Sequence, residues 1–185
     1  MEKYSRIKAL ISLDAIRYNF EQMKKNIKEG TKIIAVIKAD AYGHGAVPIA
    51  RMLEEFDYIW GFAAATAQEA LQLRKAGITR PILILGLVFE EYYKKLAEND
   101  VRMAVCDYET ARKFNKAAEA AGKKGLIHLA ADTGMTRIGF KDREESLEEI
   151  RRIAALPNVE IEGLFTHFAR ADEYDRTPAM VQLKR

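Results

Sequence analysis

Short apolar runs alternate with amphipathic segments along most of the chain. Near-continuous apolar runs of four to seven residues are typical of strands that are covered on both faces. The runs predict six strands, at residues 33–37, 58–63, 82–85, 101–105, 126–131 and 159–165. A shorter candidate strand at residues 9–13 precedes them. We therefore expect a sheet of at least six strands.

Helices are predicted between the strands, because apolar residues there recur every three or four positions. Several of these segments begin with residues that commonly cap helices: Asp14, Asp107, and Thr66, which is followed by Glu69 in the capping-box pattern. The predicted helices cover about residues 14–29, 47–56, 66–76, 90–98, 107–121 and 146–156, and another begins near residue 177.

Strands that alternate with helices at this pitch indicate a parallel sheet with helix-covered faces. Doubly wound sheets and (β/α)₈ barrels share this pattern, and periodicity alone does not separate them. Polar and reactive residues follow the ends of the first, fifth and sixth predicted strands, near residues 38, 131 and 166. A barrel gathers its strand ends around one axis, so this distribution favours a TIM-like barrel. Six βα units are two short of a closed barrel of eight.

Composition narrows the class of protein. The chain has 185 residues, enough for one domain, with 49% apolar residues and a net charge of +3. Its basic residues are scattered, which argues against nucleic-acid binding. The single cysteine, Cys106, excludes an internal disulfide. No apolar run is long enough to span a membrane, and the first residues are polar, so a cytoplasmic location is expected.

Lys38 carries the strongest chemical signal. It follows a buried-type strand and precedes a polar turn that contains Tyr42, His44 and two glycines. A partly desolvated lysine loses charge readily, and the neutral amine attacks carbonyl carbons. A covalent link to an aldehyde cofactor is one use of such a residue. An ordinary lysine that extends from a strand end to solvent is the alternative.

Three segments together resemble the alanine racemases. They are the decapeptide at residues 36–45, the segment at 128–140 and the segment at 162–169, in family order and at family-like spacing. The resemblance implies a (β/α) barrel that binds pyridoxal 5′-phosphate (PLP), followed in the family by a C-terminal β-domain. Residues 1–13 would then belong with the β-domain, and residues 14–185 would form an incomplete barrel of about six units.

The resemblance also implies roles for four residues and no metal. Lys38 would bind PLP covalently and act as one of two catalytic bases. Tyr42 would contact the cofactor phosphate. Arg137 would lie near the phenolic oxygen of PLP and the substrate carboxylate, unless it forms a surface salt bridge with Asp132 or Asp142. His167 would lie against the cofactor ring.

The sequence departs from the family at one informative position. A lysine usually precedes the arginine of the second segment by seven residues and holds it in place, but this position is Ala130. No segment here matches the family tyrosine that serves as the base on the opposite face of the substrate, or the arginine that contacts the pyridine nitrogen. We therefore expect the chain alone to racemise alanine poorly.

The resulting function hypothesis is a PLP-dependent isomerase that interconverts L- and D-alanine and supplies D-alanine for peptidoglycan. A homo-oligomer is expected, since the family forms dimers. One alternative is a barrel that binds PLP without racemase activity. Another is a truncated or engineered barrel scaffold with no catalysis, and a PLP-dependent decarboxylase of the same fold is a third.

Overall fold

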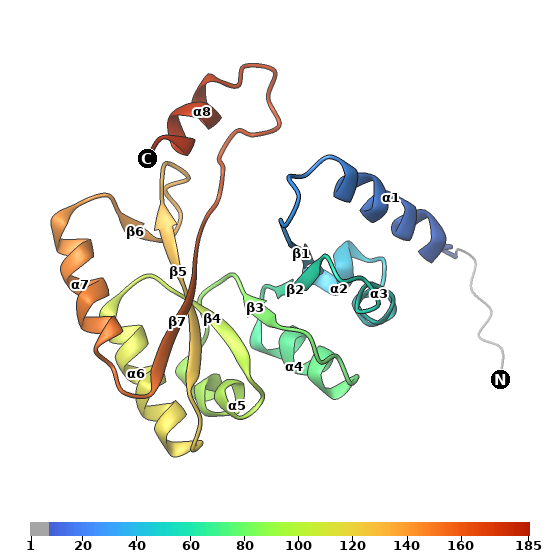
Figure 1. Ribbon diagram of the computed structural model, residues 1–185. Helices are drawn as coiled ribbons and strands as arrows, with labels where there is room; N and C mark the ends of the chain where they lie inside the picture. The colour runs from blue at the N-terminus through green and yellow to red at the C-terminus, as the bar shows by residue number, and fades with distance from the viewer. Residues whose placement is uncertain (1–7) are drawn as a thin grey trace.

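A computed structural model describes residues 8–185 and shows a curved parallel sheet with helices packed against it (Figure 1). Five strands lie side by side in chain order, and β7 (Val159–Thr166) pairs with the other side of the fifth. All of these pairings are parallel. The five strands are β1 (Ile33–Val36), β2 (Ile59–Ala64), β3 (Ile82–Ile84), β4 (Val101–Val105) and β5 (Gly125–Asp132).

The helices alternate with the strands, as the pattern predicts, and the first precedes β1 while the last follows β7. They are α1 (Leu13–Lys25), α2 (Lys38–Tyr42), α3 (Ala46–Leu53), α4 (Ala67–Lys75), α5 (Tyr93–Glu98) with the short 3₁₀ turn η1 (Glu90–Tyr92) before it, α6 (Tyr108–Ala120), α7 (Glu144–Ala154) and α8 (Thr177–Leu183). Within residues 8–185, none of the helices has the length and apolar character that crossing a membrane requires.

The main hydrophobic core lies between the strands and the helices that follow them. Its largest fully buried side chains include Phe62 on β2, Leu73 on α4 and Phe114 on α6. Phe114 packs edge to face against Tyr93, with ring centroids 5.7 Å apart. Gly125 begins β5 where Phe114 crosses it, and a Cβ at this position would lie 2.7 Å from the Phe114 ring. The close approach of helix and strand therefore requires glycine here.

The sheet is an incomplete barrel, which confirms the predicted fold class. Among the described residues, β1 pairs with β2 and β7 pairs with β5, but β1 and β7 do not pair with each other. Both strands are therefore edges of the sheet. Leu164 on β7 is 67% exposed, because no further strand covers it. No antiparallel pairing occurs within residues 8–185.

The prediction of a strand at residues 9–13 is wrong. Residues 8–12 form no regular structure, and α1 begins at Leu13. A strand needs a hydrogen-bonding neighbour, and the described chain offers none here, so Leu10 is 91% exposed. The assignment of residues 1–13 to a β-domain stays a prediction, and residues 1–7 lie outside the described part of the chain.

The observed helix N-caps test the caps that the sequence predicted. The capping box at Thr66 and Glu69 and the cap at Asp107 are confirmed. The predicted cap at Asp14 is wrong, because the Ser12 hydroxyl accepts the Ala15 N–H at 3.2 Å and starts α1 earlier. A two-residue strand, β6 (Phe140–Lys141), pairs with the last residues of β5 and had no sequence signal.

Candidate functional site

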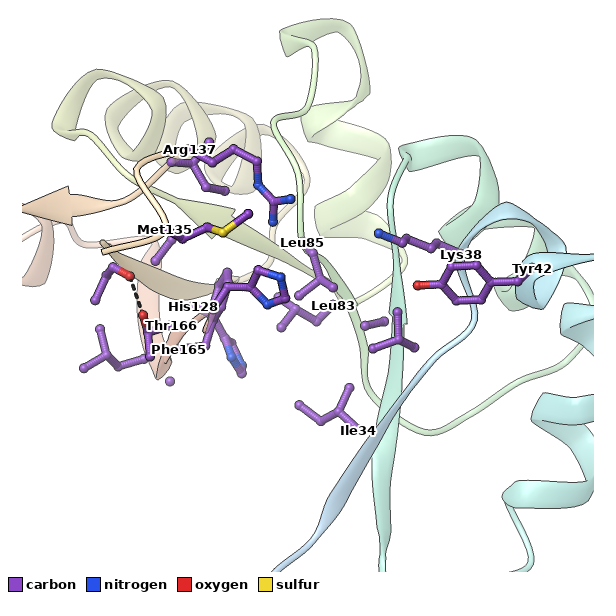
Figure 2. Close-up of a pocket in the computed structure, with 18 residues that line it drawn as sticks. Ile34, Lys38, Tyr42, Leu83, Leu85, His128, Met135, Arg137, Phe165 and Thr166 are labelled. Carbon is purple, nitrogen blue, oxygen red and sulfur yellow. Dashed lines mark hydrogen bonds between the residues drawn. The ribbon is translucent and has the colours of Figure 1, made fainter. Parts of the chain in front are cut away.

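A cavity of about 460 Å³ opens at the carboxyl ends of the strands (Figure 2). Apolar side chains from β1 and the β3 segment, including Val36, Leu83 and Leu85, form part of its wall. The four site residues predicted from the sequence all line this cavity: Lys38, Tyr42, Arg137 and His167. The fold therefore brings together side chains from three connections that are far apart in sequence.

Lys38 and Tyr42 lie on the same side of the cavity (Figure 2). The Lys38 Nζ atom is 5.8 Å from the centroid of the Tyr42 ring. An ammonium at this distance from an aromatic face gains about 0.5–1 kcal/mol when the pair is exposed. Tyr42 is 61% exposed, so its hydroxyl is accessible to a ligand. The ring thus lies beside the lysine amine without enclosing it.

The turn after Lys38 has an unusual backbone. Four consecutive residues without glycine, Ala39 to Tyr42, have φ angles between 50° and 55°. Left-handed helical geometry costs roughly 1–2 kcal/mol per residue for L-amino acids. Backbone hydrogen bonds within the turn offset part of this cost, including Ala41 N–H to the Ile37 carbonyl at 2.9 Å. Such strain persists where the surroundings over-determine it, most often at functional sites.

Asp40 links the end of this turn to the next helix. Its Oδ1 atom accepts the Ala46 N–H, at the start of α3, at 2.7 Å. Gly43 and Gly45 have φ angles of 84° and 90°, which glycine adopts without strain. His44 does not line the cavity, and its Nδ1 atom lies 3.0 Å from the Ala41 carbonyl. His44 therefore stabilises the turn locally.

Arg137 comes from the loop between β5 and β6, on the opposite side of the cavity from Lys38 (Figure 2). Asp132 shapes this loop, since its Oδ1 atom accepts the N–H groups of Gly134 at 3.1 Å and Thr136 at 2.8 Å. The alternative salt bridge is absent, because Arg137 pairs with neither Asp132 nor Asp142. The guanidinium thus faces the cavity.

Gln182 on α8 fastens the loops that carry Arg137 and His167, and sequence reasoning missed it. Its side chain is buried, with 8% exposure. The amide nitrogen donates to the Thr133 hydroxyl at 3.0 Å and to the His167 carbonyl at 3.2 Å. The amide oxygen accepts the Ala169 N–H at 2.8 Å. The only available signal was a polar residue on the apolar face of a short helix.

A cluster of ionisable side chains from β4, β5 and β7 adjoins the cavity. The Arg102 guanidinium binds both carboxylate oxygens of Glu162, at 2.9 and 2.8 Å. The Nε2 atom of His128, which also lines the cavity, is 2.9 Å from Glu162. The Arg102 guanidinium, followed by the His128 hydrogen bond, holds the pKa of the Glu162 carboxyl below its usual value, against the opposing effect of burial. Trp60 packs beside both Arg102 and His128.

Ala130 lines the cavity and is buried. Its methyl group provides no charge beside Arg137, as the sequence suggested. The neighbouring hydroxyls of Thr133 and Thr166, 2.7 Å apart, supply polar groups at this end of the sheet. The Thr166 hydroxyl also donates to the Ala131 carbonyl at 2.9 Å (Figure 2). The site therefore combines one primary amine, one phenol, one guanidinium and two imidazoles with an apolar wall.

Comparison with known proteins identifies the family to which the chain is similar. The profile described as "Alanine racemase, N-terminal domain" matches residues 11–185. The alanine racemase of Methanococcus maripaludis is 42% identical over 177 residues, which cover 96% of this chain and 47% of that protein.

Two solved structures are similar in fold as well as sequence. The alanine racemase of Clostridium difficile 630 is 43% identical with a TM-score of 0.91, over 94% of this chain and 46% of that one. The histidine racemase of Leuconostoc mesenteroides is 31% identical with a TM-score of 0.85, over 94% of this chain and 46% of that one. The chain thus spans about half the length of the relatives it matches.

Proposed function

We propose, because the chain belongs to the alanine racemase family, that it forms the PLP-binding part of an enzyme that interconverts L- and D-alanine. The observation that carries the proposal is the convergence of Lys38, Tyr42, Arg137 and His167 on one cavity. The family explains why these residue types recur at these positions. The cellular role we propose is the supply of D-alanine for peptidoglycan in the cytoplasm.

The residues present fit PLP in size and chemistry. A volume of about 460 Å³ lies in the range typical of small-molecule sites. The Lys38 amine can bond to the cofactor aldehyde, and the accessible Tyr42 hydroxyl can donate to its phosphate. The His167 imidazole would lie against the ring, and the apolar wall of Val36, Leu83 and Leu85 would exclude water from its surroundings.

PLP, when bound, supplies the electron sink that makes the α-proton of an amino acid acidic enough to transfer. The residues of this chain supply binding, orientation and one proton-transfer group. Lys38 would take or return the α-proton on one face of the substrate. Arg137 would hold the substrate carboxylate, because a guanidinium matches two carboxylate oxygens. Racemisation also needs a base on the other face, and no segment matching the family tyrosine is present.

Alanine is the substrate we propose, and the histidine racemase gives a second candidate. That protein shares the fold at 31% identity, so the scaffold itself does not restrict the substrate side chain. A PLP-binding role without racemisation is the alternative that Ala130 favours, since Arg137 lacks the neighbour found in the family. We also propose that the chain acts in a homo-oligomer.

The first prediction tests the cofactor link. Addition of PLP to the purified chain should produce a new visible absorbance band, and borohydride should then fix the label on Lys38. Peptide mass mapping identifies the labelled residue. Lys38→Arg should abolish the band, whereas Lys25→Arg, on the exposed surface of α1, should retain it. A label distributed over several surface lysines, with no preference for Lys38, would refute the proposal.

A further inference from the structure

Glu69 joins two parts of the site that are 30 residues apart in sequence. It is the third residue of α4, and its Oε2 atom accepts the N–H groups of Ala65 at 2.8 Å and Thr66 at 3.3 Å. The bond to Thr66 completes the capping box. Its Oε1 atom accepts a further N–H, that of Ala39, at 2.9 Å. A capping box satisfies only the start of its own helix, so the bond to Ala39 requires another explanation.

The bond to Ala39 acts on the residue before it, Lys38. The N–H of Ala39 and the carbonyl of Lys38 belong to one planar peptide unit. The chain before Lys38 is also held, because the Ile37 N–H donates to the Ala63 carbonyl at 2.9 Å. Restraining the peptide plane after Lys38 therefore restrains its ψ angle and the direction of its Cα–Cβ bond. Ala39 is also the first of the four left-handed residues. A carboxylate forms stronger hydrogen bonds than a neutral acceptor, which suits it to restrain a strained turn.

We propose that Glu69 is a positioning residue that holds the turn after Lys38 and so directs the lysine into the cavity. The inference rests on the proposed function, in which Lys38 binds the cofactor. Glu69 itself is not among the residues that line the cavity, and it acts through the backbone of Ala39. One carboxylate thus couples the N-terminus of α4 to the geometry of the reactive amine.

The chain provides a matched control. Glu69→Ala removes all of the hydrogen bonds that the carboxylate accepts. Thr66→Ala removes the other half of the same capping box, because the Thr66 hydroxyl accepts the Glu69 N–H at 3.2 Å, but it leaves Ala39 untouched. Both variants weaken the start of α4. Only Glu69→Ala also removes the hydrogen bond that holds Ala39 in the turn. Glu69→Gln, which keeps the side-chain length but only one acceptor oxygen, serves if Glu69→Ala fails to fold.

Two measurements test the proposal. Amide hydrogen exchange in the cofactor-free protein reports on the turn through Ala39 and Gly43, whose N–H donates to the Ala39 carbonyl at 3.0 Å. The rate of borohydride-fixed PLP labelling at Lys38 reports on the amine. Glu69→Ala should speed exchange at these amides and slow Lys38 labelling, each by about tenfold or more. Thr66→Ala should change both by less than about twofold.

The outcomes separate this inference from the proposed function. Unchanged exchange at Ala39 in Glu69→Ala would overturn the inference, and so would equal slowing of Lys38 labelling in the two variants. Faster exchange with normal labelling would also overturn it, since the turn would then not direct the lysine. If the unmodified chain fails to label at Lys38, the proposed function fails, and the exchange rates still decide whether Glu69 holds the turn.

Discussion

At the residue scale, Lys38, the proposed base, and Arg137, the proposed partner of the substrate carboxylate, lie on opposite sides of one cavity (Figure 2). Lys38 was identifiable from its own segment, because a lysine after a buried strand and before a glycine-containing turn is distinctive. Arg137 was also identifiable from its segment, but the segment did not predict the direction in which its side chain points. Asp132 binds two backbone N–H groups, so its carboxylate shapes the loop instead of pairing with the arginine.

Arg137→Lys tests the role of the guanidinium. The variant keeps the positive charge and loses the planar fork, so we expect the PLP-loaded chain to bind alanine about tenfold more weakly, as for loss of one charged hydrogen bond of about 1.5 kcal/mol or more. Titration with alanine, followed by the change in cofactor absorbance, measures the affinity. Arg143→Lys, whose side chain is exposed and pairs with Glu145, is the control. Equal affinities in the two variants would contradict a substrate contact at Arg137.

At the element scale, side chains that link strands hold the curved sheet in shape. Arg102 on β4, His128 on β5 and Glu162 on β7 meet in one cluster, although β4 and β7 lie on opposite sides of β5. On α8, Gln182 ties the loops after β5 and β7 together. Because Arg137 and His167 follow the ends of β5 and β7, these cross-links help to set the shape of their side of the cavity.

Glu162 should make the free energy of unfolding depend on pH in the acidic range. Its pKa is lowered in the folded chain, chiefly by Arg102, so its contribution is present above the unfolded pKa near 4.5 and is lost as pH falls through the lower folded value. The free energy of unfolding should therefore fall below about pH 5. Glu162→Gln should reduce that fall and, at neutral pH, cost about 1–3 kcal/mol by leaving Arg102 without its partner.

Urea unfolding across the acidic range measures this effect. Glu160→Gln is the matched control, since Glu160 lies on the same strand with its side chain exposed. The role assigned to Glu162 is wrong if both variants show the same dependence of unfolding free energy on pH.

At the scale of the whole molecule, the open barrel leaves β1 and β7 as unpaired edges in the described chain. Unpaired edges form backbone hydrogen bonds readily with other chains. Exposed apolar side chains beside the edges, Val36 on β1 and Leu164 on β7, add a hydrophobic contribution to such contacts.

We therefore predict that the chain self-associates through these edges. Sedimentation at several concentrations should show a mass that rises with concentration. Leu164→Lys should shift the equilibrium towards the monomer, because a lysine on an edge strand opposes pairing. Leu183→Lys, at a residue that is similarly exposed on α8 at 65%, should not. A compact monomer at all concentrations would show that the open sheet protects its own edges.

The sequence by itself determined the order and type of most elements, because periodicity and caps are local. Thr66 with Glu69 and Asp107 started helices as predicted, and the apolar runs located six strands to within a residue or two at most ends. The segment at residues 9–13 has the same apolar character but forms no strand, because a strand depends on a neighbour that local pattern does not reveal.

Tertiary structure alone decided how the site is assembled. The left-handed turn after Lys38 contains no glycine in its four strained residues, and bonds from distant groups such as Glu69 hold it. The contacts of Gln182 with Thr133 and His167 also join segments that are far apart in sequence. Sequence patterns report the preferences of neighbouring residues, whereas strain, orientation and the cavity depend on contacts that form only when the chain is folded.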